Sequence, residues 1–352
     1  MRELDEIRII PGYACNLECK YCFQKDRNRT MDFGFTQEGI DAIVDIISKQ
    51  LKYKDIEVLF YGGEVLIFWD RLKTIIEIIE KLRYNGNRAR MLLISNGKLL
   101  DSDIVKYCNI HDVSICISYD GKNSMTCRGF NPMENKKLLY SVNRLNFHAT
   151  FSAWNYPLDY VDEMNVFAKK YHLMNNRYPQ INGDFIYDFK GIQEMDLDRV
   201  KKEMNIIMDR FEAFCDGNEE FLSSYLLVRY LMFYFNCPGP ESEPICNWRN
   251  RGYITTDGQL LLCANSCKVM GKYTDDPDLK KCYEVYNSTP ILRNNLCKDC
   301  NAWYICKGGC SFMEDDTRIE NLCPITKAGI GTVMERLWKW KGVDDDVWDK
   351  RT

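Results

Sequence analysis

Histidine and concentrated positive charge are both scarce in this sequence. Its 352 residues include three histidines, His111, His148 and His172, which argues against a histidine-built zinc hydrolase or a Ser-His triad. Lysine and arginine total 47 against 51 aspartates and glutamates, a formal net charge of −4. Because nucleic-acid binding needs clustered cations, we expect no nucleic-acid partner.

Long apolar segments are also missing. The N-terminal sequence MRELDEIRII has no basic region followed by an apolar stretch, so it does not resemble a signal peptide. The most apolar helical stretch, Phe221–Phe235, contains Arg229 and is shorter than the roughly 20 residues that span a bilayer. We therefore expect a cytoplasmic protein with no membrane partner. Hydrophobic residues still form 45% of the chain, enough for a large core.

Cysteine is abundant by contrast. The chain has 17 cysteines, an odd number, and no visible secretory signal, which argues against a secreted disulfide framework. With so little histidine, any metal bound here is expected to be held by sulfur.

The first half alternates short β-rich runs with longer amphipathic ones. The strand-like runs are Asp5–Ile10, Glu57–Tyr61, Met91–Ser95, Val113–Ser118, Ala149–Trp154 and Gly183–Tyr187, and the helical ones are Gln37–Leu51, Trp69–Tyr84, Asp101–Tyr107, Met133–Leu145, Leu158–Tyr171 and Leu197–Phe214. Six βα units predict a parallel sheet with helices outside, an α/β fold in the form of a partial (β/α)6 TIM-like barrel, since a closed barrel needs eight. Active residues of such a sheet belong at the carboxyl ends of its strands.

The second half has a different character. We expect the barrel over residues 1–215, a helical bridge over 216–245, and a small cysteine-rich domain with a C-terminal helix over 246–352. Prolines break the bridge at CPGPESEPIC, and the turn-rich region that follows has little apolar sequence for a core of its own. Bound metal is therefore expected to stabilise it.

The segment after the first strand contains Cys15, Cys19 and Cys22, in a C-x3-C-x2-C pattern. Three thiolates on one loop can bind three irons of a cubane and leave the fourth iron without a protein ligand. An open coordination position is typical of a reactive metal centre. A zinc site or three unrelated cysteines remain the alternatives.

Three later strands end in short motifs. They are Gly62-Gly63-Glu64, Ser95-Asn96-Gly97 and Ser118-Tyr119-Asp120-Gly121. Glycines allow a ligand to approach the backbone, and a carboxylate can bind an ammonium group. Each motif alone is also compatible with an ordinary strand-to-helix turn.

Together these motifs resemble the radical S-adenosylmethionine (SAM) superfamily. Its C-x3-C-x-aromatic-C loop is matched with Tyr21 as the aromatic residue, and its GGEP motif is matched except that Val65 replaces proline. The resemblance implies that the open iron chelates the methionine part of SAM. It also implies a set of SAM contacts: Tyr21, Gly62, Gly63, Glu64, Ser95, Asn96, Ser118 and, for the SAM carboxylate, Arg128.

The second half resembles the SPASM extension of that superfamily, which holds two auxiliary 4Fe–4S clusters, although part of its pattern is also typical of a zinc ribbon. The resemblance implies one cluster on Cys297, Cys300, Cys306 and Cys323, and another on Cys246, Cys263 and Cys310. Cys237 is the expected fourth ligand of the latter, with Cys267 as its competitor. Cys108, Cys116 and Cys215 are expected to be small buried hydrophobes.

The resemblance implies an oxidoreductase or peptide maturase that cleaves SAM reductively and removes a hydrogen from a ribosomally made peptide or a protein side chain, giving a crosslink or an oxidation. It implies three 4Fe–4S clusters, a flavodoxin- or ferredoxin-type electron donor, and a leader-peptide-binding protein if leader recognition is needed. Tyr187, Asp188 and Asn155 are expected near the substrate from position alone. The alternatives are a small-molecule dehydrogenase or epimerase and an anaerobic sulfatase-maturing enzyme, against which Ala264 counts, because that group carries an aspartate there.

Overall fold

The computed structural model describes residues 4–22, 24, 30–185, 194–233, 251–264, 268–275, 297, 300–302, 306, 316 and 318–340. Its centre is a ten-stranded sheet in the order β10-β9-β8-β1-β2-β4-β5-β6-β7, with β3 paired to β4. The strands are β1 (Glu6–Ile10), β2 (Ile56–Phe60), β3 (Arg83–Tyr84), β4 (Asn87–Ser95), β5 (Ser114–Ser118), β6 (Leu145–Phe151), β7 (Gln180–Phe185), β8 (Arg251–Thr255), β9 (Gln259–Leu261) and β10 (Val269–Lys272).

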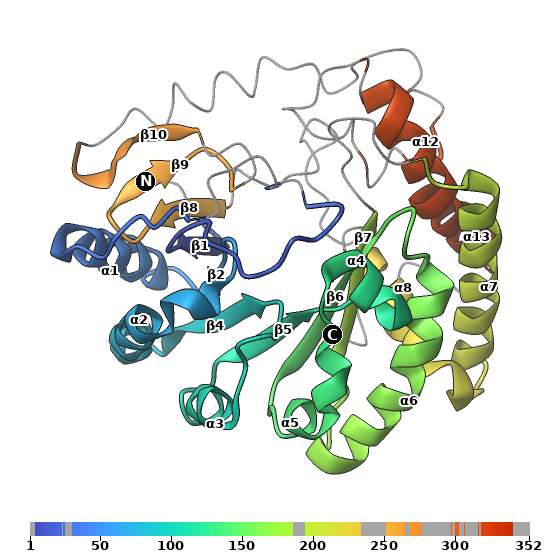
Figure 1. Cartoon of the computed structure of the whole chain (residues 1–352), viewed down its shortest axis with the longest axis horizontal. Helices are drawn as coiled ribbons and strands as arrows, with labels where there is room; N and C mark the ends of the chain where they lie inside the picture. Colours follow the sequence, from blue (N-terminus) through green and yellow to red (C-terminus); the bar gives the residue numbers. More distant parts are fainter. Residues whose placement is uncertain are drawn as a thin grey trace.

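The six strands β1, β2, β4, β5, β6 and β7 run parallel. β7 and β10 lie at opposite ends of the strand order, so the sheet is open. Helices α1 (Gln37–Leu51), α2 (Trp69–Lys81), α3 (Ser102–Ile110), α5 (Lys136–Tyr140) and α6 (Pro157–Asn175) lie along its convex side (Figure 1). The predicted α/β fold with an open, partial barrel is confirmed.

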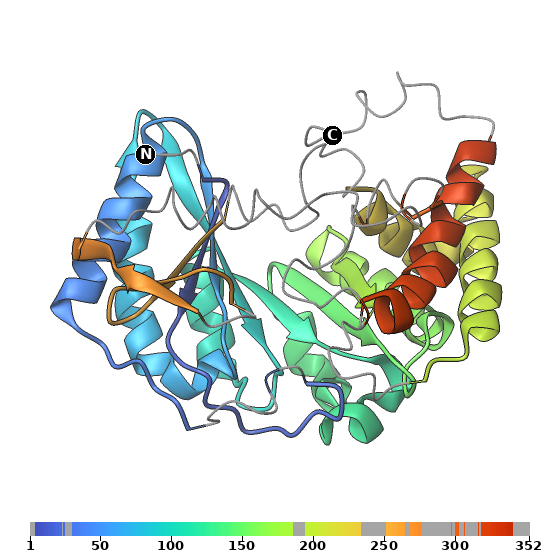
Figure 2. The same ribbon diagram turned by 90° about the horizontal axis from the view of Figure 1, so that it is seen from above.

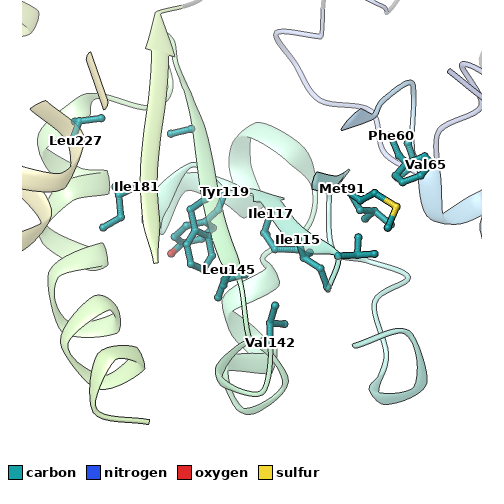
Figure 3. Close-up of a cluster of buried hydrophobic side chains, with 14 of the residues drawn as sticks. Phe60, Val65, Met91, Ile115, Ile117, Tyr119, Val142, Leu145, Ile181 and Leu227 are labelled. Carbon is teal, nitrogen blue, oxygen red and sulfur yellow. The ribbon is translucent and has the colours of Figure 1, made fainter. Parts of the chain in front are cut away.

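The hydrophobic core lies between the strands and these helices. Along β6 every second residue is buried, namely Leu145, Phe147, Ala149 and Phe151. The strand alternates because successive side chains point to opposite faces. Ile115, Ile117 and Ile181 from neighbouring strands join the same cluster (Figure 3). The half-buried residues between them therefore face the other, concave side of the sheet.

Several predicted boundaries were wrong, and two of the differences have a clear local cause. The helix expected to reach Tyr84 ends at Lys81, because Asn85 and Gly86, both with positive φ, form a tight hairpin turn between β3 and β4. The strand expected to start at Ala149 begins at Leu145, where the buried Tyr171 hydroxyl accepts a hydrogen bond from the Leu145 amide.

The remaining helices gather at the β7 end of the sheet. They are α4 (Ser124–Arg128), α7 (Leu197–Cys215), α8 (Leu222–Phe233), α12 (Cys323–Thr326) and α13 (Thr332–Lys339). Figure 2 shows α13 alongside α7, while β8–β10 lie at the opposite end, beside β1. The described segments of the second half therefore flank the barrel on both sides. In the part of the chain that is described, no helix combines the length and apolarity needed to cross a membrane.

Candidate functional site

The three cysteines of the first motif lie on the loop that follows β1, which we call the cluster loop (residues 11–22). Cys15, Cys19 and Cys22 are all half-buried. The Cys22 amide donates to the Cys19 carbonyl at 3.1 Å, and the Lys20 amide donates to the carbonyl of Cys127 in α4 at 2.9 Å. The loop is thus attached to a segment that follows β5.

The Cys19 thiol has a pKa raised to about 11, first because of burial and further because Cys22, Asp120 and Cys15 are near, while Arg128 opposes the shift. Cys15 and Cys22 therefore lie close enough to Cys19 to influence its thiol electrostatically. Among the described residues, no three Cys, His, Asp or Glu side chains meet closely enough to hold one metal ion. A cubane differs, because each thiolate binds a different iron. By its chemistry, this donor set fits an iron–sulfur cluster better than a single ion.

Gly62 and Gly63 lie directly against the cluster loop. A Cβ on Gly62 would approach the Gly12 carbonyl oxygen to 2.3 Å, and one on Gly63 would approach the Ala14 oxygen to 2.3 Å. The Gly63 and Glu64 amides donate to the same two carbonyls, at 3.2 and 2.8 Å. Only glycine permits this contact between the end of β2 and the loop after β1.

The Glu64 carboxylate is fully buried and bound by its own chain. Oε1 accepts from the Leu66 amide at 3.0 Å and the Ser95 hydroxyl at 2.8 Å, while Oε2 accepts from the Asn96 amide at 2.7 Å. Burial raises the pKa of Glu64, although these three hydrogen bonds oppose the shift. Asn96 Nδ2 also donates to Asn16 Oδ1 in the cluster loop at 2.7 Å. Glu64, Ser95 and Asn96, predicted as SAM contacts, thus join β2, β4 and the cluster loop.

The half-buried Tyr21 and the buried Asp120 and Arg128 form a second group. Arg128 donates through Nε at 2.8 Å and Nη2 at 3.1 Å to the Asp120 carboxylate, which also accepts from the Tyr21 hydroxyl. The structure thus brings two predicted residues, Tyr21 and Arg128, together through Asp120, to which the sequence assigned no role. The SxDG-like pattern at Ser118–Gly121 was the signal available for it.

Ser118, another predicted contact, is half-buried at the end of β5 and lies opposite His148 in the sheet register. His148 Nε2 lies 3.2 Å from Asp184 Oδ2, and the Tyr230 hydroxyl donates to Asp184 Oδ1 at 3.5 Å. This polar group on the concave face of β6 and β7 was not predicted. The alternation of polar residues along both strands was its only sequence signal.

The remaining predicted site residues lie only partly within the described part of the chain. Cys297 is buried, and Cys263, Cys300, Cys306 and Cys323 are half-buried. Cys237, Cys246, Cys267, Cys310, Tyr187 and Asp188 lie outside the described residues. Asn155 is completely buried, and its Nδ2 donates to the Thr150 carbonyl at 3.4 Å. Cys108 and Cys116 are buried as expected, but Cys215 is exposed because it ends α7, which corrects the prediction.

Residues 9–137 match the family described as the Radical SAM superfamily. That range includes the cluster loop, the GGE motif and Arg128. This part of the chain is a radical SAM domain.

Several curated relatives align with most of the length of this chain. The radical SAM cyclopropyl synthase TigE of Paramaledivibacter caminithermalis is 24% identical over 340 residues, covering 88% of this chain and 68% of TigE. The cysteine-type anaerobic sulfatase-maturating enzyme of Clostridium perfringens (strain 13 / Type A) is 22% identical over 342 residues, covering 88% of this chain and 89% of that enzyme.

A solved structure of native anSMEcpe with bound AdoMet and Kp18Cys peptide has a TM-score of 0.65 and 17% identity, covering 95% of this chain and 99% of that one. At this identity the likeness establishes the fold of this protein and not its substrate.

Proposed function

We propose that this protein binds a 4Fe–4S cluster through Cys15, Cys19 and Cys22, cleaves SAM reductively, and removes a hydrogen atom from a ribosomally made peptide or a protein side chain, giving a crosslink or an oxidised product. The observation that carries the proposal is the attachment of a three-cysteine loop to two strand ends, through Gly62–Glu64 and through Tyr21. When bound, the cluster and SAM supply a 5′-deoxyadenosyl radical.

The chain's own residues would position SAM beside the cluster. Arg128 uses Nε and Nη2 on Asp120, and within the described part of the chain its Nη1 has no hydrogen-bond partner. Nη1 is therefore the atom we assign to the SAM carboxylate. Glu64 acts indirectly, since its carboxylate already accepts three internal donors, and the ligand contact is assigned to the backbone around Gly62 and Gly63.

We place the substrate on the concave face, beside Ser118. The His148–Asp184 pair there is partly exposed, with side-chain exposures of 32% and 44%. If Nε2–H donates to Asp184, Nδ1 has a free lone pair that can accept a proton from the substrate. The expected substrate positions Tyr187 and Asp188 directly follow the end of β7, the strand that carries Asp184.

The auxiliary clusters remain part of the proposal. Cys263, Cys297, Cys300, Cys306 and Cys323, together with Cys237, Cys246 and Cys310, would hold two SPASM-type clusters that accept the electron released when the substrate is oxidised. A flavodoxin- or ferredoxin-type protein would reduce the SAM-binding cluster, and a separate protein would bind any leader peptide.

The relatives support a peptide or protein substrate, since one is named as a sulfatase-maturating enzyme and a solved neighbour holds a peptide. Sulfatase maturation itself is disfavoured. Anaerobic sulfatase-maturing enzymes carry an aspartate at the position that Ala264 occupies in this chain. Ala264 is 1% exposed and packs with Tyr13. An apolar methyl group cannot accept the proton.

The decisive experiment incubates anaerobically reconstituted protein with SAM and dithionite and measures 5′-deoxyadenosine by mass spectrometry. We expect its formation in the wild type and its loss in the Cys19→Ala variant. Absence of 5′-deoxyadenosine from the wild type would overturn the proposal.

The substrate class is tested with a short peptide rich in Cys, Trp or Tyr, encoded beside this gene. A mass loss of about two hydrogens per modification is the expected result, because a crosslink or an oxidation removes two. An unchanged peptide with SAM cleavage intact would favour a small-molecule dehydrogenase or epimerase.

A further inference from the structure

Asp120 is the centre of the second group described above. Its carboxylate accepts hydrogen bonds from Arg128, from the Tyr21 hydroxyl and from the Thr150 amide at 3.0 Å. Its own amide donates to the Ser124 hydroxyl at 2.7 Å. Each carboxylate oxygen therefore accepts two donors, and the acceptor capacity of this fully buried group is satisfied.

The hydrogen bonds of Asp120 join three segments that are distant in sequence. Tyr21 belongs to the cluster loop, Arg128 ends α4, and Thr150 lies in β6. The Arg128 guanidinium also lies 5.3 Å from the centre of the Tyr21 ring, within the range of a cation–π contact. The backbone bond from Lys20 to Cys127 is a second connection between the same loop and the same helix.

General stability is a poor explanation for this arrangement. The side chains of Asp120 and Arg128 are 0% and 9% exposed, the most buried ion pair in the described part of the chain. A buried ion pair of this kind is often no more stable than well-packed apolar residues in its place, because both charges lose their hydration. What an apolar pair cannot supply is a directional acceptor for the Tyr21 hydroxyl.

We propose that Asp120 is a positioning residue of the cluster loop, holding Tyr21 and Arg128 in one rigid arrangement so that Cys19 and Cys22, on either side of Tyr21, keep a fixed place at the end of β5. The inference rests on the proposed function only in assigning cluster ligands to that loop. Asp120 acts through Tyr21 and Arg128, and it needs no contact with SAM or substrate.

Tyr21→Phe tests this most cleanly, because it removes one hydroxyl and leaves the ion pair intact. Its matched control is Tyr171→Phe, which removes a buried hydroxyl bonded to Val142, on the convex side and away from the cluster loop. Amide hydrogen exchange of residues 13–22 is measured by mass spectrometry in the full-length protein, both cluster-loaded and iron-free. SAM affinity is measured by titrating the electron paramagnetic resonance signal of the reduced cluster.

We expect Tyr21→Phe to speed exchange in the cluster loop by about tenfold, the size expected when a hydrogen bond to a charged acceptor is lost, and to weaken SAM binding. Tyr171→Phe should leave both unchanged. Asp120→Asn should speed loop exchange more than Tyr21→Phe, because it also leaves Arg128 without its counter-charge.

The inference would be overturned if amide exchange in the cluster loop were equally fast in Tyr21→Phe and Tyr171→Phe. It would also be overturned if Asp120→Asn folded and its cluster loop exchanged at the wild-type rate. Different results would contradict the two proposals. If the wild type bound no iron–sulfur cluster, the proposed function would be wrong, but amide exchange rates in the iron-free protein would still show whether Asp120 positions the cluster loop.

Discussion

Glu64 shows what the structure adds at the scale of a single residue. The sequence motif predicted a carboxylate that binds a ligand, yet its two oxygens accept donors from Leu66, Ser95 and Asn96. A buried carboxylate without such donors would be strongly destabilising. Glu64 therefore fixes the relative position of two strand ends, which is why the proposed ligand contact is assigned to the neighbouring backbone.

The stability contribution of Glu64 should depend on pH. Burial raises its pKa in the folded protein, so the native state binds this proton more tightly than the unfolded chain. The contribution is complete below the unfolded pKa of roughly 4.3 and is lost as pH rises through the folded value. Glu64→Gln does not titrate. We therefore expect the unfolding free energy of wild type minus that of the variant to fall as pH increases, measured by urea unfolding of iron-free protein. A constant or rising difference would contradict this.

Thiol reactivity should separate structural from exposed cysteines. Burial raises the pKa of both Cys108 and Cys116 to about 12, so at pH 8 about one thiol in ten thousand is ionised. Cys215 is exposed. In iron-free native protein, we expect iodoacetamide to modify Cys215 at least tenfold faster than Cys108 or Cys116. Peptide mapping over time measures the rates, and comparable labelling of all three would refute the assigned burial.

At the scale of elements, the cluster loop is held between two strand ends. The end of β2 contacts it through the carbonyls of Gly12 and Ala14, and the segment after β5 contacts it through Lys20 and Tyr21. In parallel sheets the carboxyl ends of adjacent strands meet at one edge, and β1 pairs directly with β2. The loop therefore depends on contacts whose partners come from other βα units.

Gly63→Ala should displace the cluster loop. The new Cβ would lie 2.3 Å from the Ala14 oxygen and 2.4 Å from the Tyr13 oxygen, both backbone atoms that a rotamer change cannot move. We expect a loss of stability of about 2–4 kcal/mol and at least a tenfold loss of SAM cleavage. Thermal unfolding and 5′-deoxyadenosine formation measure the two effects.

Gly252→Ala is the control for this substitution. In β8 the added Cβ meets the end of the flexible Leu4 side chain, at 3.0 Å. A Gly63→Ala protein as active as Gly252→Ala would show that the loop tolerates the displacement.

At the scale of the whole molecule, the barrel core does not rely on metal. The main buried cluster consists almost entirely of aliphatic and aromatic side chains of the strands and helices, and Cys108 is its only cysteine among the described residues. Burial of this surface is the dominant stabilising term for the barrel. Those cysteines assigned to clusters that the structure describes lie outside it.

Iron removal should therefore abolish activity without unfolding the barrel. Three cubanes require roughly 12 irons per chain, and Cys15→Ala/Cys19→Ala/Cys22→Ala should retain about 8. Chelation under reducing conditions should eliminate SAM cleavage but preserve most of the far-ultraviolet circular dichroism. If the triple variant and the wild type contained the same amount of iron, these three cysteines would bind no cluster. If the wild type contained zinc and no iron, radical SAM chemistry would be excluded.

The sequence by itself determined the order of βα units and the position of the cysteine and glycine motifs at strand ends, because both depend on local periodicity and spacing. The tertiary structure alone decided which groups meet. Tyr21 and Asp120 are 99 residues apart, β8 joins the edge of β1 in parallel, and His148 reaches Asp184 on the next strand. Such contacts have no sequence period, since they depend on strand register and twist across the whole sheet. That is why the sequence could predict ligands for the site but not the residues that hold the cluster loop in place.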